Sequence, residues 1–225
     1  MPRLRTLLAL RTSCKQQVDL ENHTVISDAE WNSLISRAYG ELYTIVFESG
    51  LQYFEYEATL TTDGTNMLSE MSDHLSTVDL SYVVDAASGS FRDLRELMAQ
   101  ERSRMSGLSG DSARFFSLVD DKIYLYPKPP SGQTYKMRYV PQPPDLTTYN
   151  DTDVVDVVSP DGHDFLIWST AVRALIKTEA DTRDAIGERE ASRVRFAESV
   201  QLRALNAPRR RIVDDGDELD ERYGW

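Results

Sequence analysis

The spacing of apolar residues changes twice along this chain, and this change constrains the fold more than any other feature. From Trp31 onward, apolar residues recur every three or four positions, which is typical of one face of an α-helix. Between Tyr53 and Pro144 the apolar and polar positions alternate, which is typical of half-buried strands. Helical spacing returns after Ser159. The sequence therefore predicts an α+β fold, in which a helical bundle built from N- and C-terminal helices carries a β-rich insertion.

The first long helix has a start signal of its own. Ser27 is followed three residues later by Glu30, which is the spacing of a capping box, and Trp31 opens the apolar stripe. We expect this helix to end near Gly50. A shorter amphipathic segment over residues 4–18 is expected to pack beside it as an antiparallel neighbour.

The middle region is expected to contain several strands and one short helix. Strands are predicted over Tyr53–Leu60, Val78–Val84, Ala113–Val119, Lys122–Tyr126 and Thr134–Val140. The second and third of these flank a further capping pattern, in which Ser90 precedes Asp93 by three residues. That pattern predicts an amphipathic helix through Leu94, Leu97 and Met98. The turn Asp120-Asp121 is expected to join two strands as a hairpin.

Helix signals return after a linker rich in proline and aspartate. Proline suits a first turn, so Pro160 predicts a helix that begins there and continues to Thr182. Gly187 is expected to interrupt the helical region. A second helical stretch is expected to follow it and to stop at residues 206–208. The apolar stripe of that stretch is expected to comprise Val194, Ala197, Val200 and Leu205.

Four regions follow from these boundaries. They are the N-terminal helices at 1–52, the β-rich insertion at 53–144, the linker and C-terminal helices at 145–206, and a C-terminal docking arm at 207–225.

Charge and cysteine content exclude some classes of protein. The chain has 25 basic and 37 acidic residues, a net charge of −12, which argues against a general nucleic-acid binder because such proteins neutralise phosphates with basic groups. A single cysteine, Cys14, cannot form an internal disulfide. The apolar stretch Leu7–Leu10 is too short for a secretory signal, so the protein is expected to stay in the compartment where it is made.

The residue types that usually carry catalysis lack the spacing that catalysis needs. The three histidines, His23, His74 and His163, have no partner spacing for a metal pair or for the base of a nucleophile. His163 beside Asp164 favours a solvated or capping role. No phosphate-binding glycine loop and no dinucleotide fingerprint occur in the sequence. We therefore expect no catalytic residue, no cofactor and no metal ion.

The C-terminal segment arranges its residue types in blocks. Three arginines precede the acidic run Asp214–Glu221, and the chain ends with two aromatic side chains of the kinds most enriched among interface anchors. The acidic run lacks the ligand spacing of a calcium loop, which favours a solvated charge run. We interpret the segment as an arm that docks on a partner. Its candidate contact residues are Arg209, Arg210, Arg211, Tyr223 and Trp225.

Six segments in their order along the chain carry a resemblance to a known family. They are Leu7–Arg11, Val18–Asn22, Ile26–Tyr43, Lys122–Pro130, Tyr135–Pro141 and Asp161–Ile167. Their combination resembles the head-to-tail adaptor, or connector, proteins of tailed bacteriophages.

The resemblance implies a structural virion protein rather than an enzyme. Such proteins form a homo-oligomeric ring, usually of twelve copies, that binds the portal protein after DNA packaging and gives the tail or nozzle proteins an attachment platform. DNA passes through the ring without specific binding, and an acidic lumen would repel its phosphates. The implied location is the neck of the virion after assembly in the host cytoplasm, with no membrane partner. The C-terminal segment of the family commonly reaches the portal, so the arm is expected to make portal contacts.

Two other functions fit the sequence less well. A tail-completion or tail-terminator ring would share the acidity and the ring assembly, but it would bind the tail tube protein. A small-molecule-binding or regulatory module would use the aromatic residues of the β-rich insertion as a pocket.

Overall fold

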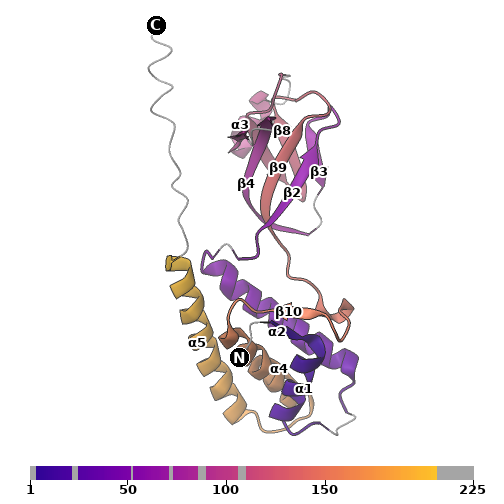
Figure 1. The fold of residues 1–225 in the computed structure, drawn as a ribbon, viewed down its shortest axis with the longest axis vertical. Helices are drawn as coiled ribbons and strands as arrows, with labels where there is room; N and C mark the ends of the chain where they lie inside the picture. The colour runs from indigo at the N-terminus through magenta and orange to yellow at the C-terminus, as the bar shows by residue number, and fades with distance from the viewer. Residues whose placement is uncertain are drawn as a thin grey trace. The chain divides into compact units, whose positions relative to one another are not determined.

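A computed structural model describes residues 4–21, 25–51, 53–70, 73–85, 90–105 and 110–206 (Figure 1). The chain divides into two compact units. The helical unit combines the described residues up to Leu51 with those from Asp145 onward, and the β unit lies within Gln52–Pro144. Helices make up the first unit and most of the strands lie in the second, so the α+β fold that the periodicity predicts is confirmed.

Four α-helices, one 3₁₀ helix and a short two-stranded sheet make up the described part of the helical unit. The helices are α1 (Leu7–Gln17), α2 (Asp28–Glu48), α4 (Pro160–Lys177) and α5 (Arg183–Asn206), with η1 at Leu146–Thr148. The sheet pairs β1 (Leu4–Thr6) with β10 (Val154–Asp156) in antiparallel fashion. The sequence did not reveal this sheet, whose two strands are far apart along the chain.

Helix α2 begins as its sequence predicts. The backbone N–H of Glu30 donates to Ser27 Oγ at 3.3 Å, and the backbone N–H of Ser27 donates to Glu30 Oε2 at 2.9 Å. Both halves of the capping box are therefore formed, and two backbone donors that the first turn leaves unpaired are satisfied.

A buried arginine joins α1 to α2 and to the segment before β10. Arg11 is 5% exposed, and its guanidinium donates to Asn32 Oδ1 at 3.1 Å and to Asp151 Oδ2 at 3.0 Å. Its Nη1 also lies 2.9 Å from Asp151 Oδ1. Near the end of α1, Lys15 Nζ lies 2.6 Å from Asp28 Oδ1 at the start of α2. The order of these contacts makes the two helices antiparallel, as predicted.

Helices α4 and α5 pack through a close approach at a glycine. The rings of Phe165 and Phe196 stack with centroids 6.0 Å apart, and both side chains are buried. A Cβ at Gly162 would lie 2.6 Å from the carbonyl oxygen of Val157 and 3.1 Å from Phe196 Cε2. Only a residue without a side chain fits between these neighbours, so Gly162 allows the first turn of α4 to reach α5.

Two predicted boundaries in this region are wrong. Helix α4 ends at Lys177 rather than Thr182, and Gly187 lies inside α5 rather than at a break. The break falls between the helices, where Glu179 has a φ of 55° and the Asp181 side chain accepts a hydrogen bond from the backbone N–H of Arg183 at 3.0 Å. A Cβ at Gly187 would meet no atom within 4 Å, so this residue occupies an ordinary helical position.

The β unit consists of two four-stranded sheets and one short helix. The first sheet has the order β2 (Tyr56–Thr61), β9 (Thr134–Pro141), β4 (His74–Asp85) and β5 (Ser90–Asp93). The second has the order β3 (Met67–Glu70), β8 (Lys122–Tyr126), β7 (Phe115–Val119) and β6 (Arg95–Glu96). Helix α3 spans Ala99–Met105. Buried residues of both sheets share one apolar core, which includes Leu80, Phe116, Ile123, Leu125, Tyr135 and Met137.

The hairpin predicted around Asp120-Asp121 is confirmed, because β7 and β8 pair in register on either side of this turn. The helix predicted from Ser90 is wrong. Residues 90–93 form β5, which pairs with β4, and Ser81 Oγ donates to Asp93 Oδ1 at 2.8 Å. The spacing of Ser90 and Asp93 therefore matches a capping pattern by coincidence, and α3 begins only at Ala99.

Candidate functional site

The described residues do not assemble a catalytic centre of the usual kinds. Within the ranges that the structure describes, no group of three or more His, Cys, Asp or Glu side chains could hold a metal ion. Burial raises the pKa of Cys14 to about 12, against a smaller opposing effect of a hydrogen bond with Thr170, so this thiol is not a nucleophile near neutral pH. In the same part of the chain, no helix combines the length and the apolar content that a membrane span requires.

The two histidines within the described residues, His74 and His163, are partly and completely buried, respectively. His163 is completely buried, so the predicted solvated role is wrong, because α5 covers the first turn of α4. His74 Nε2 lies 2.8 Å from Thr77 Oγ1, and its ring stacks on Tyr139 at 6.2 Å. Burial lowers the pKa of His74, and nearby carboxylates oppose this effect. His23 lies outside the described residues.

One face of the first sheet is covered by charges that pair with one another. Glu57, Asp79 and Arg138 are directly opposite in the strand register and therefore share a face. Arg138 binds Asp79, and Lys136 Nζ lies 2.6 Å from Glu57 Oε1. Glu55 Oε2 lies 3.9 Å from Arg138, and burial raises the pKa of Glu55 more than this arginine lowers it. Glu57 and Asp79 therefore lie on a polar face of the sheet.

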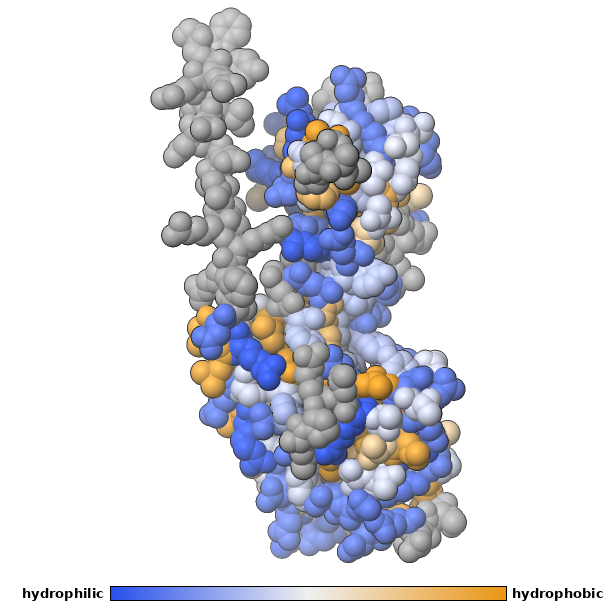
Figure 2. Space-filling model, in the orientation of Figure 1, coloured by the Kyte–Doolittle hydropathy of each residue, from blue (hydrophilic) through white to orange (hydrophobic). Residues whose placement is uncertain are grey.

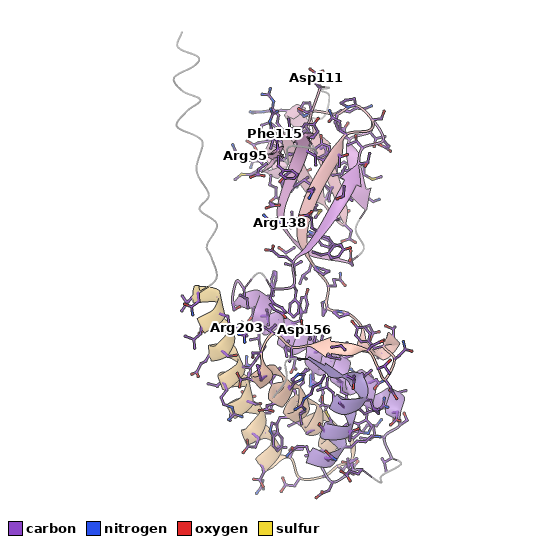
Figure 3. The ribbon with its side chains drawn as sticks, viewed as in Figure 1. Arg95, Asp111, Phe115, Arg138, Asp156 and Arg203 are labelled. Carbon is purple, nitrogen blue, oxygen red and sulfur yellow. The ribbon has the colours of Figure 1, made fainter. Side chains whose placement is uncertain are left out.

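Helix α5 is held in place by polar contacts at both ends as well as by its apolar core. Glu41 on α2 accepts hydrogen bonds from Arg173 on α4 at 2.7 Å and from Arg189 on α5 at 3.3 Å. At the other end, Arg203 Nη1 donates to the carbonyl oxygen of Val158 at 2.8 Å (Figure 3 labels Arg203). The helix is therefore fixed against α2, α4 and the turn before α4.

The opposite side of α5 exposes apolar side chains. We define the α5 outer face as Val194, Leu202 and Leu205, which are 55%, 61% and 66% exposed. Their spacing of eight and three residues places them on one side of the helix. Figure 2 shows hydrophobic side chains gathered near the C-terminal end of α5. Exposed apolar patches commonly mark surfaces that bind another protein.

The sequence pointed to the wrong stripe on this helix. Val194 and Leu205 were expected to lie on the same face as Val200, but Val200 is buried and the other two are exposed. The buried face instead includes Ala185, Ser192, Phe196 and Val200. A stripe of small and polar residues around Phe196 gives a weaker hydrophobic signal than the outer face does, which is why the spacing alone was misleading.

The predicted arm residues, Arg209, Arg210, Arg211, Tyr223 and Trp225, lie outside the described residues. The structure therefore does not place them or bring them together. They follow α5 directly in the sequence, since the last residue of α5 is Asn206. The α5 outer face and the predicted arm are thus continuous along the chain.

A family model described as SU10 adaptor protein matches residues 5–216. The match covers nearly the whole chain, so the protein belongs to this family of bacteriophage adaptor proteins, and the resemblance noted from the sequence is confirmed. No curated protein sequence matches the chain.

Proposed function

We propose that this protein is a head-to-tail adaptor that assembles as a homo-oligomeric ring on the portal and provides the platform for tail attachment. The observation that supports this role most directly is the α5 outer face, because it is apolar, exposed and continuous with the predicted arm. Membership of the SU10 adaptor protein family supports the same role.

The proposed interface uses two parts of the chain in sequence. The α5 outer face supplies apolar surface whose burial favours association. The arm then supplies Arg209, Arg210, Arg211, Tyr223 and Trp225 as further portal contacts. Because Glu41 and Arg203 anchor α5 to the rest of the helical unit, the apolar face is presented on a rigid helix and less ordering is needed on binding.

The ring proposed here contains twelve copies in the virion neck, forms in the host cytoplasm and surrounds the DNA channel. The net charge of −12 suits this role, because carboxylates that face a channel repel phosphates and leave DNA free to slide. Binding is mediated by surfaces and needs no catalytic residue or cofactor.

Substitutions on the α5 outer face test the proposal. Leu202→Asp together with Leu205→Asp is expected to leave the monomer folded, because both side chains are exposed, and to weaken assembly on the cognate portal at least tenfold. Assembly is measured by light scattering and by negative-stain imaging of the mixture. Arg193→Asp, on the same helix but exposed on another side of it, changes the net charge by the same amount and is the matched control. Unchanged assembly of the double variant would contradict the proposed interface.

Truncation after Asn206 tests the arm separately. We expect a folded protein that no longer assembles on the portal, and unimpaired assembly would show that the arm is dispensable. Binding to the tail tube protein instead of the portal, in a pull-down with each, would support the tail-terminator function and overturn the adaptor assignment to the portal.

A further inference from the structure

Four strands lie at the edges of the two sheets in the described part of the β unit, and β2 differs from the other three. Strands β3, β5 and β6 have four, four and two residues, and the register shifts within the pairs that β3 and β5 form. Short strands and such irregularities keep sheet edges from pairing with other chains. Strand β2 has six residues and pairs with β9 in continuous register (Figure 1). It contains no lysine and no proline, so it is the least protected edge of the β unit.

The direction of the β2 backbone groups follows from a hydrogen bond at the end of the strand. The backbone N–H of Thr62 donates to the carbonyl oxygen of Gln133 at 2.9 Å, and these residues continue the β2–β9 register. Residues that bond across an antiparallel pair alternate with residues that do not. The backbone groups of Glu57, Thr59 and Thr61 therefore point away from β9. We call these outward groups the β2 edge. All three residues are exposed, and no strand within the described ranges pairs with this edge.

The side chains of β2 differ between the two faces of the sheet. Glu57, Thr59 and Thr61 lie on the charged outer face, and the residues between them lie on the core face. On the core face, Tyr56 is 59% exposed and Leu60 is half-buried. A strand added at the β2 edge would place alternate side chains beside Tyr56 and Leu60, and the others beside Glu57.

The charges along β2 favour one kind of partner. Residues 53–66, which comprise β2 and the segments beside it, contain Glu55, Glu57 and Asp63 and no basic residue. Lys136 on β9 lies 2.6 Å from Glu57, but the side chain of Glu57 is 50% exposed, and a carboxylate accepts several hydrogen bonds. The segment therefore favours basic side chains on an incoming strand.

We propose that the β2 edge binds an extended segment of a partner protein by strand addition, and that basic and apolar residues alternate along that segment. Its backbone binds the outward groups of Glu57, Thr59 and Thr61. Its basic side chains lie on the side of Glu57, and its apolar side chains lie on the side of Tyr56. The site lies wholly within the β unit and uses no residue of the α5 outer face or of the arm. It is therefore independent of the proposed portal interface.

A second copy of this chain is the less favoured occupant. Two β2 edges that pair with each other form a symmetric contact, which joins two copies and cannot continue around a ring. The two segments would also carry the same sign of charge. Pairing of β2 with β5 of another copy is disfavoured by the shift in register that interrupts the short edge at β5.

The first experiment measures peptide binding to the full-length protein without portal. The probe is a fluorescent peptide of about eight residues in which lysine and valine alternate, and anisotropy measures binding. Its lysines should lie opposite Glu57, Thr59 and Thr61 and turn their backbone N–H groups toward β2. Methylation of the lysine backbone nitrogens is expected to abolish binding, and methylation of the valine nitrogens is expected to preserve it. No binding of the unmethylated probe, or equal effects of the two methylations, would overturn the proposal.

A proline in β2 tests the edge from the side of the protein. Thr59→Pro removes an N–H that points away from β9, so the pairing with β9 is retained. We expect the probe to bind about tenfold more weakly, because one backbone hydrogen bond is lost and its neighbours are disturbed. Thr59→Val keeps the N–H and is the matched control, with unchanged affinity expected. Equal affinities of the two variants would count against strand addition.

A charge reversal tests the same contact without a change in the backbone. Glu57→Lys is expected to weaken binding of the lysine–valine probe and to allow binding of a probe in which glutamate and valine alternate. Glu96→Lys on β6 is also exposed and changes the net charge equally, so it is the control, and we expect it to bind both probes as the unchanged protein does. Equal effects of the two reversals would show that only net charge matters, and the proposal would fail.

Two further measurements separate this site from other interfaces. The double variant Leu202→Asp and Leu205→Asp, which should lose portal assembly, is expected to bind the lysine–valine probe normally. Loss of probe binding in that variant would contradict the independence of the two sites. Light scattering of the protein without portal tests the second copy as occupant. A dimer that Thr59→Pro converts to a monomer would assign the β2 edge to pairing between copies and overturn the proposal.

Discussion

The helical unit and the β unit use charged side chains in different ways. In the helical unit, Arg11 joins Asp151 across 140 positions of the sequence, and Arg189 joins Glu41 across 148. In the β unit, Arg138 and Lys136 pair with carboxylates on adjacent strands of one sheet. The ion pairs of Arg11 and Arg189 thus connect segments that are distant in the sequence, whereas those of Arg138 and Lys136 cover one face of a sheet.

The exposure of the arginine side chains affects how much their ion pairs contribute to stability. The side chain of Arg11 is 6% exposed and that of Arg138 is 27% exposed. Water screens the guanidinium of Arg11 less than that of Arg138, so loss of Arg11 is expected to cost more. The helical unit therefore depends on contacts between segments that are distant in sequence, and the β unit depends on strand register and its shared apolar core.

Removal of core side chains should give the largest effects and test whether the two units lose stability separately. Phe196→Ala removes a buried ring between α4 and α5 and should lower the free energy of unfolding by about 3–5 kcal/mol. Met137→Ala in the β unit should cost about 2–5 kcal/mol. Hydrogen exchange read by mass spectrometry shows where protection is lost. Equal loss of protection in β9 and α4 for Phe196→Ala would mean that the two units unfold together.

The two arginines provide the next test. Arg11→Ala should destabilise the helical unit by about 2–3 kcal/mol, because it removes several hydrogen bonds at a buried site. Arg138→Ala should cost about 1 kcal/mol or less, because its pairs lie on a solvated face. Urea denaturation measures both. Arg11→Met retains apolar volume and should recover part of the loss, and equal costs for Arg11→Ala and Arg138→Ala would remove the contrast between the units.

Glycines also serve different purposes in the two units. Gly162→Ala should cost about 1–3 kcal/mol because the new Cβ would clash with Val157 and Phe196. Gly132→Ala in the β unit should cost about 1–2 kcal/mol because the backbone has a φ of 84°. Gly187→Ala is the control within a helix and should stabilise by about 0.5–1 kcal/mol. Thermal unfolding ranks the three, and a stabilising Gly162→Ala would contradict the close approach of α4 and α5.

Lowering the pH should change the stability of the two units in opposite directions. We expect this to be the smallest of the effects. A hydrogen bond from Lys177 and another from the backbone of Ser27 lower the pKa of Glu30 from 4.5 to about 2. The lowered pKa contributes stability above pH 4.5 that is lost as the pH falls from 4.5 toward 2. Burial raises the pKa of Glu55, so this carboxyl contributes stability at low pH that is lost as the pH rises through its raised pKa.

Carboxyl NMR titration measures both groups. Lys177→Met should move the pKa of Glu30 upward and leave that of Glu55 unchanged. A shift of Glu55 as large as that of Glu30 would show that the two units are electrostatically coupled.

Local signals in the sequence were sufficient for much of the fold. The capping box at Ser27 and the hairpin at Asp120 depend on residues a few positions apart, and both are present. Ser90 and Asp93 show the limit of such signals, because their spacing suits a helix and they nevertheless lie in a strand beside β4. Pairing with a strand outside the local segment outweighed the local preference there.

The candidate site shows the same limit. The arm was predicted from its residue types, but the α5 outer face was not. That face depends on which side of the helix the other elements cover. A stripe of large apolar residues with strong periodicity would have identified the buried face of α5. Ala185 and Ser192 share that face with Phe196, and their small or polar side chains give only a weak periodic signal.

The sequence by itself determined the α+β class, the start of α2, the hairpin at Asp120 and the resemblance to adaptor proteins, because periodicity, caps and turns act between near neighbours. Only the tertiary structure decided which face of α5 is buried, that β1 pairs with β10, and which arginines find carboxylates. These outcomes depend on partners up to 152 positions away in the sequence, as with Leu4 and Asp156, and packing rather than local preference selects among them.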